Sequence, residues 1–180
     1  MDPIQVIEKY YPPRSKAFRI LVDHCRLVTD KALGIAANHP ELNPDTVFIR
    51  NAAMLHDIGI FMTNAPNLYC YGDYPYICHG YLGQELLSNE GFPEYGLVCE
   101  RHTGTGITVD DILEQKLPLP LRNYVPESVE EQIICFADKF YSKGGGQLYR
   151  EKPVQEIRKT MLKFGKKNVS RFDEWCEIFL

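Results

Sequence analysis

The stretch MLHDIGIF, from Met54 to Phe61, constrains the fold of this chain more than any other feature. It places His56 and Asp57 side by side inside an otherwise apolar run, directly before Ile58 and Gly59. Burying an unpaired charge costs several kcal/mol or more. A fold that buries this run must therefore bind the imidazole and the carboxylate with groups from elsewhere in the chain.

Composition predicts a soluble domain with a substantial core. The chain has 180 residues, of which 44% are hydrophobic and 24% charged. The net charge of -4 provides no overall positive field, so we expect neither a DNA or RNA partner nor a membrane partner. Charges interrupt the longest apolar runs before the roughly 20 residues that a membrane helix needs, and the first residues lack the layout of a signal peptide. A cytoplasmic protein with reduced cysteines is expected.

Helical periodicity dominates the chain, and no segment alternates strongly enough to predict a sheet. Apolar residues recur at three- and four-residue steps from Ser15 to Asn38, with His24 near the apolar face. Residues 60–78, rich in Pro, Gly, Asn and Tyr, are expected to form a long ordered loop. We expect a single all-α domain over residues 1–180, a bundle of about seven to nine helices. The helices are predicted at residues 3–11, 15–38, 44–57, 79–91, 93–102, 108–116, 128–143, 154–165 and 170–180.

Four histidines and one aspartate occupy unusual positions in this pattern. His24, His56, His79 and His102 each fall on an apolar helix face or at a helix end. Taken singly, each is more simply explained as a hydrogen-bonded core residue. Asp138 changes the balance, because ICFADKFY places it on an inward helix face and Asp is almost never fully buried without a partner. Lys139 should point about 100° away around the helix, so Asp138 requires a metal ion or a buried ion pair.

The order and context of these residues resemble the HD-domain superfamily of metal-dependent phosphohydrolases, in its dinuclear subgroup. The strings MLHDIGIF, CHGYLGQELL, ERHTGTGIT and FADKFYSK carry the resemblance, which covers residues 17–143. It implies one metal ion held by the first histidine, the HD pair and the late aspartate, which are here His24, His56, Asp57 and Asp138. It also implies a second ion held by the two intervening histidines, here His79 and His102.

The resemblance further implies that Asp57 bridges the two metals and is central to catalysis. Divalent transition metals such as Fe, Mn, Co, Ni or Zn suit this set of nitrogen and oxygen donors. Two such ions would lower the pKa of a water molecule, which then attacks phosphorus in line. Ile60 stands where many relatives have a lysine, and no GYP motif follows His102, so cyclic di-GMP hydrolysis is not expected. The strings HGYLG and RHTGTG are more similar to the symmetrical dinucleoside tetraphosphatase branch.

Substrate-binding residues are predicted from their places beside these ligands. Tyr74 lies in a tyrosine-rich loop that could stack on a nucleobase or pack on its own core. Arg101, Lys139 and Lys143 could contact phosphate, with a solvated surface charge as the alternative for each. Lys139 follows Asp138 in the ADK string and is the strongest candidate for a catalytic role. Thr103 lies in the HTGTG turn, whose amides could bind a phosphate oxygen.

These features lead to three hypotheses of function. The first is a metal-dependent phosphohydrolase acting on a nucleotide or other small phosphoester. The second keeps the same ligands but makes the pair a di-iron oxygenase that acts on an inositol or a phosphonate. The third is a nucleotide sensor without turnover, or a structural metal site, although six ligands spread over two metals leave open positions that structural sites usually lack. Residues 144–146, a run of three glycines, are expected to be a connector, and the helices at 153–180 to pack on the domain.

Overall fold

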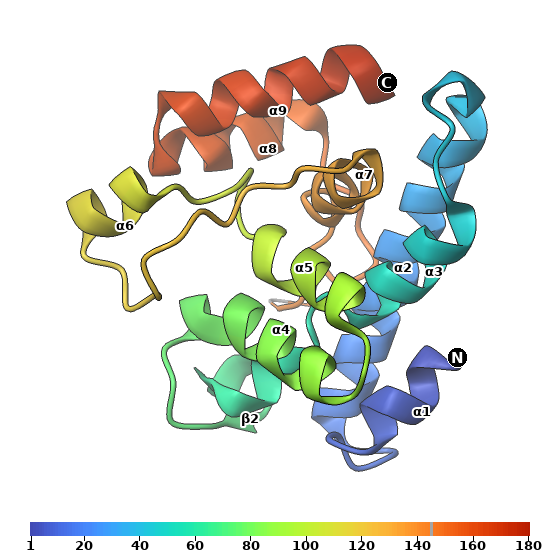
Figure 1. The fold of residues 1–180 in the computed structure, drawn as a ribbon, viewed down its shortest axis with the longest axis vertical. Helices are drawn as coiled ribbons and strands as arrows, with labels where there is room; N and C mark the ends of the chain where they lie inside the picture. The colour runs from blue at the N-terminus through green and yellow to red at the C-terminus, as the bar shows by residue number, and fades with distance from the viewer. Residues whose placement is uncertain (145) are drawn as a thin grey trace.

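The structure is a computed structural model that describes residues 1–144 and 146–180, and it is built from helices joined by both short and long connections (Figure 1). The prediction of an all-α fold is confirmed. Gly145, in the middle of the predicted glycine connector, lies outside the described residues. The α-helices are α1 (Pro3–Glu8), α2 (Lys16–Asn38), α3 (Thr46–Leu55), α4 (His79–Asn89), α5 (Pro93–Arg101), α6 (Val109–Gln115), α7 (Val129–Asp138), α8 (Val154–Met161) and α9 (Lys166–Phe179).

Short polar side chains start several of these helices. Ser15 accepts a hydrogen bond from a first-turn amide of α2 at 3.0 Å, and Ser128 does the same for α7 at 3.2 Å. Asp45 accepts from two amides of α3, both at 2.9 Å. Thr108 forms a reciprocal capping box at the start of α6. Each cap satisfies amides that have no partner inside the helix and stabilises it by about 1 kcal/mol.

Two helices end earlier than predicted, and both ends lie at the site. Helix α3 stops at Leu55, so His56 is its C-cap and Asp57 lies outside the helix. Helix α7 stops at Asp138 instead of continuing to residue 143, so Asp138 lies at the end of the helix and not in its middle. Helix α9 begins at Lys166, earlier than the predicted residue 170. Helix ends are difficult to predict because neighbouring packing decides where the chain leaves the helical path.

Gly59 does not act as the left-handed helix cap that its position suggests. Its φ is not among the positive values of the backbone, and it lies inside the 3-10 helix Ile58–Met62. A Cβ at this position would come within 2.2 Å of the His79 carbonyl oxygen and 2.6 Å of the Gly83 amide nitrogen. The glycine therefore allows the 3-10 helix to lie directly against α4.

The predicted loop at residues 60–78 contains regular structure. Strands β1 (Asn64–Ala65) and β2 (Cys70–Tyr71) form an antiparallel pair, with Asn64 opposite Tyr71 and Ala65 opposite Cys70. Single 3-10 turns at Pro66–Leu68 and Tyr76–Cys78 complete the segment. Strands of two residues are too short to show an alternating pattern, so the sequence gives no sign of them.

The core consists of two apolar clusters. One cluster joins the C-terminal half of α2 with α3, α7, α8 and α9, and the other joins α1, the N-terminal half of α2 and the segment after α3. His24 lies between Cys25 of the second cluster and Val28 of the first, and Asp138 follows Ala137 of the first. The polar residues of interest therefore lie where the two clusters meet.

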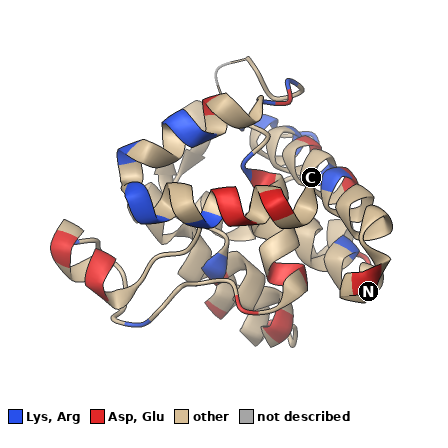
Figure 2. Cartoon of the chain, turned by 90° about the horizontal axis from the view of Figure 1, so that it is seen from above, with Lys and Arg blue, Asp and Glu red and all other residues tan. Residues whose placement is uncertain are grey.

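Helices α8 and α9 lie over α7 (Figure 1). The ring of Phe136 on α7 packs against Phe172 at a centroid distance of 5.3 Å and against Phe179 at 5.4 Å. Acidic and basic residues are intermixed along the helices in Figure 2. Within residues 1–144 and 146–180, none of the helices combines the length and the apolar character needed to cross a lipid bilayer.

Candidate metal centre

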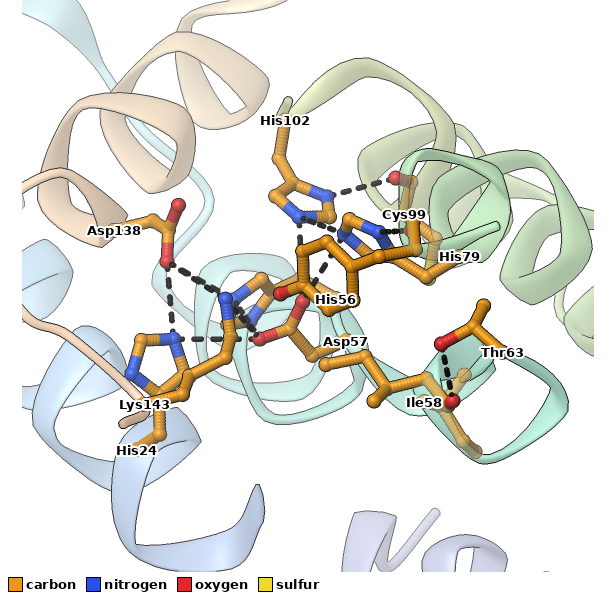
Figure 3. Close-up of polar contacts among 12 residues, drawn as sticks. His24, His56, Asp57, Ile58, Thr63, His79, Cys99, His102, Asp138 and Lys143 are labelled. Atoms are coloured by element: carbon orange, nitrogen blue, oxygen red, sulfur yellow. Dashed lines mark hydrogen bonds and ion pairs between the residues drawn. The ribbon is translucent and has the colours of Figure 1, made fainter. Parts of the chain in front are cut away.

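The six predicted metal ligands converge on one buried site, and each comes from a helix or from the end of one (Figure 3). Helix α2 contributes its ligand from its middle, α4 from its first residue, and α3, α5 and α7 from their C-terminal ends. All six side chains belong to residues that are at most 8% exposed. They are His24, His56, Asp57, His79, His102 and Asp138.

The first set comprises His24, His56, Asp57 and Asp138. Nε2 of His24 lies 3.0 Å from Oδ1 of Asp138 and 3.3 Å from Oδ2 of Asp57. Nε2 of His56 lies 3.2 Å from the same Asp57 oxygen and 3.5 Å from the same Asp138 oxygen. Two imidazole nitrogens thus face two carboxylate oxygens across one small space.

The second set comprises Asp57, His79 and His102. Oδ1 of Asp57 lies 3.4 Å from Nε2 of His79 and 3.3 Å from Nε2 of His102, and these two nitrogens are 3.1 Å apart. Asp57 therefore directs one carboxylate oxygen to each set. This arrangement matches a carboxylate that bridges two metal ions, the role that the sequence predicts for Asp57.

The hydrogen bonds of the imidazoles show that their inward nitrogens carry lone pairs. Nδ1 of His56, His79 and His102 lies 2.6 to 2.7 Å from the carbonyl oxygens of Ala53, Tyr76 and Cys99, respectively. A carbonyl only accepts, so each Nδ1 must donate, and Nε2 of the neutral ring is left as an acceptor. In the second set three acceptors face one another. Such a group is repulsive without a bound cation.

The spacing of the ligand atoms fits divalent metal ions. Ligand bonds of about 2.1 Å place neighbouring ligand atoms about 3.0 Å apart around an octahedral ion and about 3.4 Å apart around a tetrahedral one. The contacts above run from 3.0 to 3.5 Å. In addition, Nε2 of His56 and Oδ1 of Asp57 have no hydrogen-bond partner among the described residues, while Oδ2 of Asp57 is met by the ammonium group of Lys143 at 2.8 Å. The residues present fit a pair of metal ions.

At His56 burial is outweighed by the carboxylates of Asp57 and Asp138, which raise the pKa of the ring well above its usual value. Burial dominates at the other three histidines. It lowers the pKa of His79 to about 3 and that of His24 to about 4, and it lowers the pKa of His102 as well. These rings are neutral at pH 7 and can bind a metal without losing a proton. Burial alone would raise the pKa of Asp138, but the positive charges of Lys139 and Lys143 outweigh it and hold that pKa well below its usual value.

Lys139 does not point away from Asp138 as the helical pattern predicts. Because α7 ends at Asp138, its side chain turns back and donates to Oδ2 of Asp138 and to the carbonyl oxygen of His102, both at 2.8 Å. Oδ2 of Asp138 thus forms the buried ion pair that was one of the two predicted alternatives. Its other oxygen, Oδ1, faces the ring nitrogens of His24 and His56, where a metal ion could bind. Lys139 is 8% exposed and already holds two partners.

Lys143 contacts the centre directly. Its Nζ lies 2.8 Å from Oδ2 of Asp57 and 3.8 Å from Oδ1 of Asp138 (Figure 3). The positive ammonium group therefore rests against the carboxylate oxygens of the first set. The prediction that Lys143 lies near the ligands is consistent with this position.

Three other predicted substrate residues make no contact with the ligand side chains among the hydrogen bonds and ion pairs of the described residues. Arg101 donates to both carboxylate oxygens of Glu131 at 3.1 Å and pairs with Glu127. These two carboxylates already neutralise its positive charge. Tyr74 is 46% exposed and does not line either cavity described below. Thr103 lines the second of them.

Two cavities adjoin the centre. The first has a volume of about 400 Å³, and its wall includes Asp138 of the first set together with Lys143 and Lys152. The second has a volume of about 350 Å³ and is mostly apolar. Tyr76, Lys139 and Met161 belong to the walls of both.

Sequence reasoning placed Tyr76 in the substrate-facing aromatic loop without singling it out, and it missed Lys152. The Tyr76 ring stacks on the His79 ring, with centroids 4.7 Å apart and planes at 28°. Tyr76 shares its loop with Tyr74, and the composition of that loop does not distinguish the two. Lys152 reaches the first cavity because its amide donates to the Phe140 carbonyl oxygen at 2.8 Å, a long-range contact without a local signature.

Among the curated proteins, three relatives are similar to this chain over part of their length. An uncharacterised protein of Methanocaldococcus jannaschii is 36% identical over 121 residues, which cover 66% of this chain and 64% of that protein. The tRNA (cytidine(56)-2'-O)-methyltransferase of Thermoplasma volcanium is 29% identical over 156 residues, covering 86% of the chain and 41% of that enzyme. The enzyme of the same name in Picrophilus torridus is 33% identical over 144 residues, which cover 74% of this chain and 38% of that enzyme. The chain thus spans between 38 and 64% of the length of these relatives.

Comparison with solved structures and family models agrees on the fold. The crystal structure of the L. monocytogenes phosphodiesterase PgpH HD domain matches with a TM-score of 0.54 at 14% identity, covering 96% of this chain and 93% of that one. At this identity the likeness shows the fold alone. A model of the HD domain matches residues 21–142, and these contain all six ligands of the centre. The chain belongs to the HD-domain family.

Proposed function

We propose that this protein is a metal-dependent phosphohydrolase that acts on a small phosphoester or phosphoanhydride, such as a nucleotide. The observation that carries the proposal is the position of Asp57, whose two oxygens face two separate sets of histidine nitrogens. Two divalent ions held in this way would stabilise negative charge on the phosphoryl oxygens and would lower the pKa of a water molecule for attack on phosphorus.

The protein's own residues hold the site ready for this chemistry. The carbonyl oxygens that accept from Nδ1 of His56, His79 and His102 fix both the tautomer and the orientation of each ring. Lys139 neutralises one oxygen of Asp138 and ties it to the His102 carbonyl oxygen. In the proposal Lys139 is a positioning residue, because its ammonium group is buried and occupied, and this replaces the catalytic role that the sequence suggested.

Binding of the phosphate falls to the lysines of the first cavity. Lys143 contacts the carboxylates of the centre, and Lys152 lines the same cavity. Among the described residues, Lys152 has no carboxylate oxygen within ion-pair distance. Its pKa is lowered by burial and by the nearby positive charges of Lys139 and Lys143. A bound anion would reduce the repulsion among these three lysines. A phosphorylated substrate complements this positive cavity.

The names of the methyltransferase relatives are not carried over to this chain. The matched segment makes up 41 and 38% of those two enzymes. The centre described here consists of histidines and carboxylates, the ligands of divalent metals. We therefore base the proposal on the site and on membership of the HD-domain family.

The experiment that tests the proposal combines elemental analysis with a screen for phosphate release. The purified protein is analysed for metals and then incubated with nucleotides and other small phosphoesters. We expect His56→Ala and Asp57→Ala to abolish both bound metal and phosphate release. Full activity of metal-stripped protein would contradict the proposal.

The same screen separates the two rival functions. A di-iron oxygenase would contain iron and take up oxygen in a substrate-dependent way, without releasing phosphate. A sensor would bind nucleotides tightly without turning any of them over. Activity with Mn or Co accompanied by phosphate release supports the hydrolase.

A further inference from the structure

The second cavity adjoins the candidate metal centre and is built partly by residues outside the family match. Met161 closes helix α8, Phe164 ends the 3-10 turn Leu162–Phe164, and Asn168 lies on α9, all beyond residue 142. The opposite wall comes from the turn at residues 103–107 and from α6. The family match therefore accounts for the metal ligands but not for this cavity.

The two cavities share part of their walls, an arrangement that fits a substrate with two chemically different parts. Tyr76 and Lys139 line both cavities, and Tyr76 stacks on His79 of the second ligand set. The first cavity is basic because of Lys143 and Lys152. A molecule whose phosphate lies at the metal ligands can therefore extend past Tyr76 into the second cavity.

The wall of the second cavity is suited to a flat ring. Its apolar residues are Ile77, Ile107, Leu117, Met161 and Phe164. Hydrogen-bonding groups, which an alkyl group would leave unused, come from Thr103, Asp111, Gln115, Lys139 and Asn168. Few polar groups in an otherwise apolar wall are typical of pockets that bind an organic ligand. At about 350 Å³ the cavity has room for one ring system.

Phe164 is exposed at this cavity. Its side chain lines the cavity although the residue is 57% exposed, whereas Phe136, Phe140 and Phe172 are at most 3% exposed. An aromatic ring in that position offers a face to a planar ligand, because bases stack favourably on aromatic side chains. Leu162, two residues earlier in the same turn, is also 57% exposed but does not line the cavity.

We infer that the second cavity binds a planar heteroaromatic ring on the leaving group of the substrate, and that Phe164 determines specificity by packing against this ring. This inference rests on the proposed phosphohydrolase function, because the metal ligands place the phosphate end of the substrate. The ring-bearing compounds that test it are the ribonucleoside 5'-mono-, di- and triphosphates.

The test compares these nucleotides with ribose 5-phosphate, which has the phosphate and the sugar but no ring system of this kind. Phosphate release is measured on the full chain loaded with Mn²⁺, for the wild type, Phe164→Ala and the matched control Leu162→Ala. We expect the wild type to prefer at least one nucleotide over ribose 5-phosphate in kcat/KM. Phe164→Ala should reduce this preference by about fivefold or more, mainly through KM, since loss of the stacking face removes about 1 kcal/mol or more.

Two results would overturn the inference. One is hydrolysis of ribose 5-phosphate as efficient as that of every nucleotide. The other is an equal preference in Phe164→Ala and Leu162→Ala. If no compound releases phosphate, the proposed function fails instead, and NMR titration of AMP and ribose 5-phosphate then tests the cavity on its own. In that case, weaker AMP binding in Phe164→Ala than in Leu162→Ala supports the inference, and equal binding overturns it.

Discussion

Replacing Gly59 by alanine should separate the two halves of the metal centre. The new Cβ would lie 2.2 Å from the carbonyl oxygen of His79 and 2.6 Å from the amide nitrogen of Gly83, where ordinary contacts begin at 3.4 Å. Both atoms are backbone, so α4 or the 3-10 helix must move by about 1 Å, because packed interiors have no spare room. His79 is the first residue of α4 and would move with it.

The expected effect on metal binding follows from these distances. Metal ligands tolerate displacements of about 0.2 Å, so a shift of α4 should disrupt the set of Asp57, His79 and His102. The first ligand set has no member on α4 and should persist. We therefore expect the Gly59→Ala protein to bind one metal ion where the wild type binds two, and a misplacement of this size to reduce turnover about a hundredfold.

Stability provides the second readout. Overpacking costs about 1–3 kcal/mol, and a clash with backbone belongs at the upper end. For a chain of this size that corresponds to a Tm lower by about 6–12 °C. Gly34→Ala is the matched control, because a Cβ there meets nothing within 4 Å on the exposed side of α2, and it should raise stability by about 0.5–1 kcal/mol. A Gly59→Ala protein with two bound ions and normal turnover would refute this reasoning.

Three further predictions follow from the centre. His79→Ala and His24→Ala should each reduce the metal content from two ions to one, and retention of two ions in either variant would argue against separate ligand sets. Lys143→Met should destabilise the metal-free protein by about 3–5 kcal/mol, because two buried carboxylates lose a cation; unfolding with and without Mn²⁺ should show a smaller loss when metal is bound, and equal losses would refute this. The free energy of unfolding of metal-free protein should fall as the pH drops from about 6.5 towards 4, because the lowered pKa values of His24, His79 and His102 outweigh the opposite contribution of His56, whose pKa is raised. The reason is that unfolded chains bind protons that the folded His24, with a pKa of about 4, and His79, with a pKa of about 3, do not; denaturant unfolding in EDTA at several pH values measures this slope, and a flat profile would contradict it.

The sequence predicted the ligands because their signals are local. His24 lies on the apolar face of a long amphipathic helix. His79 and His102 lie at helix ends that glycine and proline residues make recognisable in the sequence. Asp138 was an isolated acid on an otherwise apolar helix face. The structure brings these residues together at the boundary between two apolar clusters. Periodicity and capping therefore sufficed for the helices, whereas the grouping of the candidate ligands came from the resemblance to the HD-domain superfamily.

Features that depend on distant contacts could not be predicted. The end of α7 at Asp138 allows Lys139 to fold back, which reverses the direction expected from a continuing helix. The role of Gly59 depends on α4, which begins 20 residues later and packs against it. Arg101 was predicted to contact phosphate, but in the structure its guanidinium group donates to the carboxylate of Glu131, which lies 30 residues later in the chain. Lys152 and Phe164 reach the cavities only through the packing of the C-terminal segment.

The number of metal ions bound per chain, in the wild type and in Asp57→Ala, tests the central claim most directly. Elemental analysis of purified protein equilibrated with Mn²⁺, combined with equilibrium binding, measures it. The account predicts two ions in the wild type and none retained in Asp57→Ala, because each ligand set depends on one oxygen of that carboxylate. A wild type that binds a single ion, or an Asp57→Ala protein that keeps both, would contradict it.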